Sequence, residues 1–175
     1  MRRDGSNKTR LLANLASPVG LALDWVAEQF YWTDDQTDVI EVCRLDGTAR
    51  AVVVAGRLAR PGPIAVSPAE GLLLWVDTTR AAPRLERAGL DGSGRATLTQ
   101  QPDLAGVSSI ALDTEAGWLY WANSDSGAGP GLGRIRYREP NAGEIEILRH
   151  KATSVCQVRL VRPNVFTFLK WRCLT

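Results

Sequence analysis

Short apolar runs separated by polar, turn-forming residues recur along the whole chain. No segment of about eleven residues or more keeps the 3.6-residue apolar spacing of an amphipathic helix. The first unit instead predicts strands near the ranges Val19 to Asp24, Gln29 to Asp34, Val39 to Leu45 and Ala49 to Ala55. The pattern therefore predicts an all-β chain of short antiparallel strands.

A four-residue box with an aromatic residue in second place recurs along the chain. Three copies, at spacings of 43 and 46 residues, are Tyr31-Trp32-Thr33-Asp34, Leu74-Trp75-Val76-Asp77 and Tyr120-Trp121-Ala122-Asn123. An eroded copy, Thr167-Phe168-Leu169-Lys170, follows 47 residues later without the acid. An Asp-Gly turn, which favours positive φ, follows each of the first two boxes at Asp46-Gly47 and Asp91-Gly92. Four strands in roughly 40 to 45 residues, repeated in tandem, are typical of β-propeller blades.

The box residues are expected to be structural. A large aromatic side chain at constant phase fills the gap between neighbouring blades, which is the role predicted for Trp32, Trp75 and Trp121. Asp34 and Asp77 recur at the fourth place, where a buried carboxylate can accept hydrogen bonds at a strand end.

Three segments of the first unit resemble one YWTD, or class B, repeat of the low-density lipoprotein receptor-related family. They are Gly20-Leu21-Ala22-Leu23-Asp24-Trp25-Val26, the box Tyr31 to Asp34, and Ile40-Glu41-Val42 followed by Arg44-Leu45-Asp46-Gly47-Thr48. The second unit, with Pro83 to Ala88 before Leu90-Asp91-Gly92-Ser93, is similar to the repeat that usually comes next. The match covers residues 1 to about 123 well and the remainder by phase only.

The resemblance implies a partial six-bladed YWTD-type propeller with about three to four blades of four strands each. On this interpretation residues 1–175 form one incomplete propeller. Its parts are an outer strand of a preceding blade (1–17), two blades (18–60 and 61–106), a divergent blade (107–153) and an eroded half blade (154–175). The chain could be a piece of a longer protein or a degenerate copy, and both alternatives stay open at this point.

The same resemblance implies an extracellular, cell-surface module that binds protein ligands, of the endocytic or Wnt co-receptor kind, usually followed by an EGF-like module. Family members bind ligands on the face formed by the loops ahead of the inner strands. The positions expected there are Val19, Gly62 and Ser108, just ahead of each inner strand, together with the loop charges Asp35, Asp38, Arg57, Arg60 and Arg80. Solvated loop charges are the alternative interpretation of those five residues.

Composition removes several other partners. Twenty-one basic and nineteen acidic side chains leave a net charge of +2, so nothing demands a nucleic acid. The longest strongly apolar run, Leu72 to Val76, is far shorter than the roughly 20 residues of a membrane span, and no signal peptide is encoded at the start. The three cysteines form no metal or redox motif, no cofactor or metal is expected, and Asn7 begins a possible glycosylation sequon.

A propeller hydrolase or lactonase is the enzymatic alternative. Such a site needs polar ligands that converge from the inner strands. Here those strands end in Asp24, Ser67 and Asp113, the lone His150 lies in a basic segment, and no G-x-S-x-G motif occurs. We therefore expect no catalytic residue and no enzyme. An open arc of blades is also expected to be only marginally stable alone, because its end faces remain in water.

Overall fold

The computed structural model describes residues 8–124, 131–138, 146–148, 158–162 and 165–168, which form antiparallel sheets. We name the three four-stranded sheets blades 1 to 3. Blade 1 contains β1 (Pro18–Asp24), β2 (Gln29–Asp34), β3 (Val39–Arg44) and β4 (Ala51–Ala55). Blade 2 contains β5 (Pro61–Ser67), β6 (Leu72–Asp77), β7 (Arg84–Gly89) and β8 (Ala96–Gln100).

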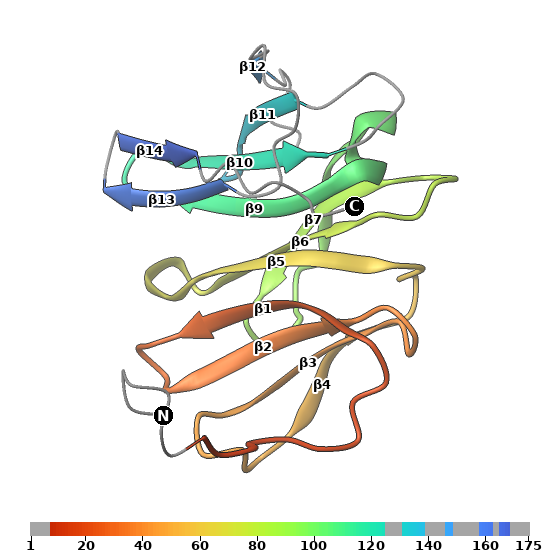
Figure 1. Cartoon of the computed structure of the whole chain (residues 1–175), viewed down its shortest axis with the longest axis vertical. Helices are drawn as coiled ribbons and strands as arrows, with labels where there is room; N and C mark the ends of the chain where they lie inside the picture. The colour runs from red at the N-terminus through yellow and green to blue at the C-terminus, as the bar shows by residue number, and fades with distance from the viewer. Residues whose placement is uncertain (1–7, 125–130, 139–145, 149–157, 163–164, 169–175) are drawn as a thin grey trace.

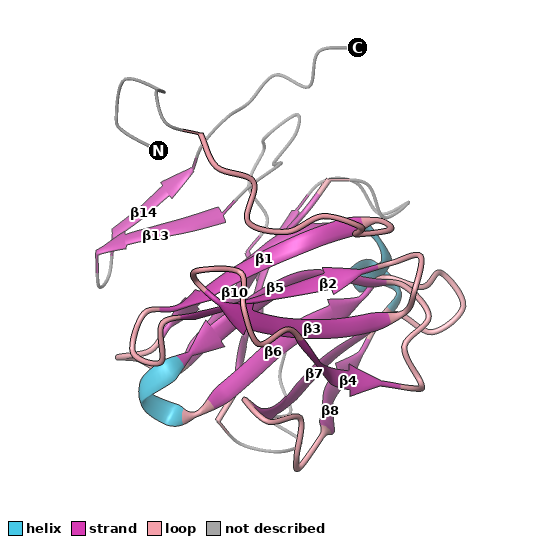
Figure 2. Cartoon of the chain, turned by 90° about the horizontal axis from the view of Figure 1, so that it is seen from below, coloured by secondary structure: helices cyan, strands magenta, loops and turns pink. Residues whose placement is uncertain are grey.

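Blade 3 contains β9 (Val107–Asp113), β10 (Trp118–Asn123), β11 (Gly131–Arg136) and β12 (Glu146–Leu148). A hairpin of β13 (Val158–Arg162) and β14 (Val165–Phe168) follows it. Two 3-10 turns, η1 (Pro68–Glu70) and η2 (Pro102–Gly106), are the helical elements of the described residues (Figure 2). In the described part of the chain no helix is long and apolar enough to span a bilayer.

The blades stack along the long axis of the molecule, with inner strands β1, β5 and β9 side by side and β13 next to β9 (Figure 1). Within each blade the strands follow chain order from inside to outside. The predicted all-β, partial-propeller fold is therefore confirmed. The outermost strand of blade 1 begins at Ala51 rather than at Ala49, because Ala49 has a φ of 55° and extends the preceding turn.

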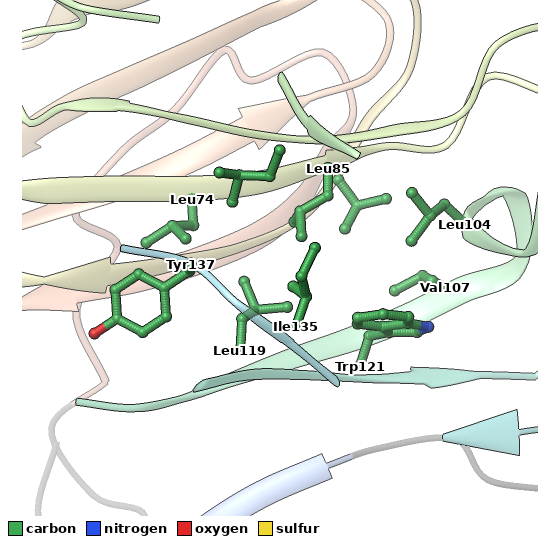
Figure 3. Packing of buried hydrophobic residues seen from close by; sticks show 10 residues of the cluster. Leu74, Leu85, Leu104, Val107, Leu119, Trp121, Ile135 and Tyr137 are labelled. Carbon is green, nitrogen blue, oxygen red and sulfur yellow. The ribbon is translucent and has the colours of Figure 1, made fainter. Parts of the chain in front are cut away.

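The blades are held together by apolar side chains between their faces. Leu74 and Leu85 of blade 2 pack against Leu119, Trp121 and Ile135 of blade 3 (Figure 3). Between blades 1 and 2, the cluster includes Tyr31, Ile40, Val54, Ile64 and Trp75. The box tryptophans Trp32, Trp75 and Trp121 are 2%, 0% and 4% exposed. Trp75 and Trp121 each lie on the face of their blade that packs against the preceding blade. The aromatic residue that recurs in the box therefore fills one blade interface per repeat.

Backbone conformation repeats together with the sequence. The β3–β4 turn has Gly47 at φ 84°, and the β7–β8 turn has Gly92 at φ 83°. In both turns the glycine amide donates to the carbonyl three residues earlier, from Gly47 to Arg44 at 2.8 Å and from Gly92 to Gly89 at 2.9 Å. The predicted positive-φ Asp-Gly turns are thus present in both blades.

A cross-blade tie fixes blade 3 on blade 2 at the end of β11. The Tyr137 hydroxyl donates to Oε2 of Glu70 at 2.5 Å, and Nη1 of Arg87 donates to the Tyr137 carbonyl at 2.9 Å. Burial, followed by the Glu70 carboxylate, raises the pKa of Tyr137 to about 12. The hydroxyl therefore stays protonated and serves as a donor throughout the ordinary pH range.

Residues 8–17, which precede β1, repeat local features of the residues that precede β5. Asn14 has a φ of 59°, and Arg57, 43 residues later and just after β4, has a φ of 53°. The amides of Ala16 and Ser17 bind the Asp34 carboxylate as the amides of Ala59 and Arg60 bind that of Asp77. No strand is assigned within residues 8–17.

Candidate ligand-binding face

A β-bulge lies at the start of every inner strand of the three blades. The pairing register shifts between Pro18 and Leu21, between Pro61 and Ile64, and in blade 3 opposite Ala122 and Asn123. Bulges bend a strand and redirect its side chains, and they are common beside functional sites. The three bulges therefore shape one edge of the inner-strand layer.

The bulges contain three of the residues expected on the ligand-binding face. They were expected just ahead of the inner strands, but the structure places them inside, as the second residues of β1, β5 and β9: Val19, Gly62 and Ser108. The expectation was wrong by two residues because Pro18, Pro61 and Val107 already pair with Asp34, Asp77 and Asn123 before each bulge.

A hollow of about 480 Å³ opens at this edge between the three blades. It is lined by backbone and small or apolar side chains of β1, β5 and β9 and by the loops beside them. Five of the eight expected residues line it, namely Val19, Asp35, Arg60, Gly62 and Ser108. The other three, Asp38, Arg57 and Arg80, lie in neighbouring loops and do not line it.

One ion pair at the rim gives the hollow its charge pattern. Nε of Arg60 lies 3.8 Å from Oδ2 of Asp35, and the two side chains are 59% and 23% exposed. A pair this long and this exposed contributes little to stability. Both charges are therefore available to a ligand.

Close backbone approach explains the small residues around the hollow. A Cβ on Gly20 would lie 2.6 Å from the Gly62 carbonyl oxygen, and one on Gly62 would lie 2.9 Å from Cγ2 of Thr78. The Thr33 hydroxyl donates to the Gly62 carbonyl at 2.7 Å and accepts from the Gly20 amide at 2.9 Å, which joins β1 to β5. Gly62 can therefore contribute only backbone groups to binding.

The box carboxylates hold the loops that surround the hollow. Oδ2 of Asp34 accepts the amides of Ala16 and Ser17 at 3.0 and 2.9 Å, and Oδ1 accepts those of Gln36 and Thr37 at 3.1 and 3.0 Å. Burial raises the pKa of Asp34, but these hydrogen bonds outweigh it and keep the pKa below its usual range. A fixed charge therefore joins the loop before β1 to the β2–β3 turn.

Blade 2 repeats this arrangement, and blade 3 modifies it. Asp77 accepts the amides of Ala59 and Arg60 at 3.0 and 3.1 Å, and also Nη2 of Arg84 at 3.0 Å. In blade 3 the amide side chain of Asn123 donates to the Asp103 carbonyl at 2.7 Å.

Sequence reasoning missed Thr78 and Ser124, which also line the hollow. Each follows the fourth residue of its box, as Asp35 does, and the three amides make equivalent hydrogen bonds. Asp35 donates to Ser17, Thr78 to Arg60, and Ser124 to Gly106, at 2.9 to 3.1 Å. The position after each box was thus a usable signal.

A second repeated group was also missed. In blade 2 the Arg95 guanidinium lies 5.4 Å from the Trp75 ring centroid and donates to both carboxylate oxygens of Glu86. In blade 1 Arg50 lies 5.3 Å from the Trp32 centroid and donates to both oxygens of Glu41 at 2.8 Å. Glu41 and Glu86 occur at one phase of the repeat, as do Arg50 and Arg95, so the pattern could have been found.

The polar residues at the far ends of the inner strands make turn hydrogen bonds. Oδ1 of Asp24 accepts the amides of Val26 and Ala27, Oδ1 of Asp113 accepts that of Ala116, and the Ser67 hydroxyl donates to Glu70. Within the described ranges, no group of three or more His, Cys, Asp or Glu side chains could hold a metal ion. Asn7, His150, Cys156 and Cys173 lie outside the described residues.

Comparison with known proteins gives related sequences and one related fold. No family profile matches the chain. It is 46% identical over 67 residues to low-density lipoprotein receptor-related protein 5 of Mus musculus, which covers 38% of the chain and 4% of that protein. It is 34% identical over 122 residues to the low-density lipoprotein receptor-related protein 5-like protein of Homo sapiens, covering 69% of the chain and 48% of that protein.

Solved structures agree with these relatives. A chain in the crystal structure of a nidogen/laminin complex superposes with a TM-score of 0.70 at 31% identity, over 78% of this chain and 50% of that one. A putative TolB from Agrobacterium tumefaciens superposes with a TM-score of 0.62 at 15% identity, over 79% of this chain and 51% of that one, which supports the fold alone.

The fold and the repeated boxes define the class of this protein as a β-propeller module of the YWTD type. The relatives then specify the family, since the chain carries the YWTD repeats of low-density lipoprotein receptor-related proteins. It spans about half, or less, of the proteins that it matches.

Proposed function

We propose that the chain is a non-enzymatic receptor module that binds a protein ligand through the hollow beside β1, β5 and β9. The observation that carries this proposal is the convergence of five expected face residues on a single hollow of about 480 Å³. The related nidogen chain belongs to a protein–protein complex with laminin, which supports a protein as ligand.

The chemistry of the rim indicates how a ligand would be recognised. Arg60 is the more exposed member of its ion pair with Asp35. Arginine is also one of the residue types that contribute most to the binding free energy at protein interfaces. A ligand carboxylate can pair with Arg60, while an apolar ligand side chain packs on Ile64 and Ile110 in the hollow. The ligand segment that we propose is therefore a loop with an acidic residue next to an apolar one.

The receptor family suggests the biological setting of this binding. We propose that the module acts in an extracellular, cell-surface ectodomain, next to an EGF-like module, with a ligand of the Wnt-pathway or endocytic kind. The polar groups that a hydrolase would need, Asp24, Ser67 and Asp113, are engaged in turns at the other end of the inner strands, which supports binding over catalysis.

The test is a binding screen with a charge-reversal pair. The full chain, Arg60→Glu and the matched control Glu115→Lys are each immobilised and presented with a panel of extracellular protein ectodomains. Glu115 is exposed in the β9–β10 turn at the opposite end of the strands. We expect to find a ligand whose affinity falls about tenfold or more with Arg60→Glu, which is a loss of about 1.4 kcal/mol or more of binding free energy. Its affinity should be unchanged with Glu115→Lys. A ligand affected only by Glu115→Lys, or no ligand at all, contradicts the proposal.

A further inference from the structure

Two of the six tryptophans of the chain lie three residues apart. They are the ends of the segment Trp118-Leu119-Tyr120-Trp121, and no other tryptophan has a tryptophan three residues after it. In proteins of the secretory pathway, W-x-x-W is the acceptor motif for C-linked mannosylation, which joins a mannose to C2 of the first indole ring. So short a motif also occurs by chance. The surroundings of the two rings therefore decide whether this segment can carry a sugar.

The two rings of the motif point to opposite sides of blade 3. Residues three positions apart in a β-strand lie on opposite faces of the sheet. Trp121 lies on the face that packs on blade 2, together with Leu74 and Leu85 (Figure 3). Trp118 lies on the other face with Tyr120 and is only partly buried. Of the two rings, that of Trp118 is therefore the one that solvent reaches.

Trp121 has no space for an added group. Its side chain is 4% exposed, and it lies opposite Gly133 of β11. A Cβ on Gly133 would lie 2.2 Å from Cζ2 and 2.8 Å from Nε1 of Trp121. The interior around this ring thus does not admit even one more carbon atom at that point. In the folded protein, a hexose can be accommodated on Trp118 and not on Trp121.

The position of Trp118 does not require an aromatic side chain. Trp118 is the first residue of β10, and Gln29 and Leu72 are the first residues of β2 and β6. All three pair with the last residue of the inner strand of their blade, so they are structurally equivalent. Blade packing therefore explains the tryptophan at position 121 but not the one at position 118.

Two arginines of β11 stack on the Trp118 ring. The guanidinium carbons of Arg134 and Arg136 lie 4.3 and 4.4 Å from the ring centroid, within cation–π distance. Carbon atoms in contact are about 3.5–4.0 Å apart, so a carbon this close to the centroid lies over a face of the ring and not beside its edge. A sugar on C2 would extend from the edge, in the plane of the ring. The two arginine carbons therefore do not occupy its place.

Polar side chains surround this end of blade 3. Arg136 is exposed and donates to the Ala116 carbonyl at 3.3 Å. The side chain of Glu146, which is 48% exposed, accepts from Nε of Arg134 at 2.8 Å. Sugar hydroxyls both donate and accept hydrogen bonds, so they can bind a guanidinium or a carboxylate. A mannose on Trp118 would therefore meet polar groups and solvent rather than an apolar core.

We propose that Trp118 is a C-mannosylation site. The donor is a polyprenyl-phosphate mannose, and a transferase acts on the chain before it folds. C2 of the indole attacks C1 of the mannose, and the C1–O bond breaks with its electron pair leaving on the phosphate. Loss of the C2 proton to a base of the transferase restores the aromatic ring, and no oxidant or reductant is consumed. The proposal rests on the extracellular setting proposed above, because donor and transferase belong to the secretory pathway.

Mass spectrometry of the secreted chain tests the site. The full chain is directed into the secretory pathway of animal cells by a signal peptide, and the tryptic peptide 96–134, which contains both tryptophans, is fragmented. We expect the mass of one hexose on Trp118 and on no other tryptophan. A carbon-linked sugar loses only part of its ring on fragmentation, whereas an O-linked hexose leaves whole. An unmodified Trp118 in the secreted chain, or an O-linked hexose alone, overturns the proposal.

Two matched variants test the motif. Trp121→Leu should abolish the hexose on Trp118, whereas Tyr120→Phe keeps both tryptophans and should leave it unchanged. Chains from which the signal peptide has been removed are analysed from inside the cells as well as from the medium, so that a folding defect does not hide the result. Equal amounts of hexose in the two variants overturn the proposal.

A third variant separates this site from the ligand-binding hollow. Trp118 lies at the end of β10 away from Ser124, which lines the hollow. Trp118→Phe should therefore remove the hexose and leave unchanged the affinity of any ligand that Arg60→Glu weakens. An unmodified Trp118 beside intact ligand binding refutes the modification alone. A modified Trp118 in a chain that binds no ligand refutes the function proposed for the hollow alone.

Discussion

At the scale of single residues, the fourth position of each box has the clearest function. Asp34 accepts four backbone amides from two loops, so one carboxylate replaces the hydrogen bonds that water would otherwise supply. The aromatic neighbours were predictable from their phase because bulky side chains recur at each interface. Two of its four partners, the amides of Ala16 and Ser17, were not predictable, because they lie 18 and 17 residues away in a loop without pattern.

Replacement of Asp34 by asparagine tests this role. The side-chain nitrogen that this substitution introduces cannot accept hydrogen bonds, so two backbone amides lose their acceptor, and each buried unsatisfied group costs about 1–3 kcal/mol. We expect Asp34→Asn to lower the free energy of unfolding by about 2–4 kcal/mol in urea melts at pH 7. Asp38→Asn, in the same β2–β3 turn, is the matched control and should change it by less than about 0.5 kcal/mol. Similar losses in both variants would contradict the role of Asp34.

Acid should remove the advantage of Asp34. Since the folded pKa of Asp34 lies below its unfolded value of about 3.9, its contribution is present above that value and is lost as pH falls through the folded pKa. The difference in stability between the native chain and Asp34→Asn should therefore shrink below about pH 4. A difference that stays constant down to about pH 2 would show that the charge is not the cause.

At the scale of elements, the turns and the bulges differ in how far the sequence predicts them. The Asp-Gly turns follow from local chemistry, because Gly47 and Gly92 have φ values that other residues rarely adopt. The bulges at Pro18–Leu21 and Pro61–Ile64 do not follow from local chemistry. A bulge is an extra residue relative to the partner strand, so it can be located only when the pairing of the two strands is known. That gap is why Val19 and Gly62 were expected ahead of their strands.

Two glycines of the β7–β8 turn separate local strain from contact between blades. Gly92 and Gly94 both have positive φ, of 83° and 61°. A Cβ at Gly92 would overlap the Val53 carbonyl of blade 1, whereas one at Gly94 would meet nothing within 4 Å. Gly94→Ala should therefore cost only the strain, about 1 kcal/mol. Gly92→Ala should cost about 2–4 kcal/mol, because overpacking adds to the strain. Equal losses in thermal or urea melts would show that blade 1 does not press on this turn.

At the scale of the whole molecule, the arc of blades follows from the repeat, but the distribution of exposed apolar surface does not. The residues Leu21 and Ile64 are equivalent in sequence and differ tenfold in exposure, 70% against 7%. Among the described residues, Ile64 is covered by side chains of blade 1, whereas no described blade covers Leu21. Stability in such an array is a sum over repeats and the interfaces between neighbours. A repeat with two interfaces is therefore held more firmly than one with a single interface.

This argument predicts a gradient of local stability across the chain. Blade 2 packs on blade 1 through the cluster around Trp75 and on blade 3 through the cluster around Leu85 and Leu119. Blade 1 has described blade contacts on one face only, and its other face carries Leu21 and Leu23 at 70% and 50% exposure. In native-state hydrogen exchange of the full chain, the amides of β6 and β7 should be the slowest, and those of β2 and β3 should exchange at least about tenfold faster.

Leu119→Ala, which removes a fully buried side chain between blades 2 and 3, should lower the free energy of unfolding by about 2–5 kcal/mol and bring the exchange rates of blade 2 toward those of blade 1. Uniform exchange across both blades, before and after that substitution, would show that the arc unfolds as one unit and that its open face carries no energetic penalty.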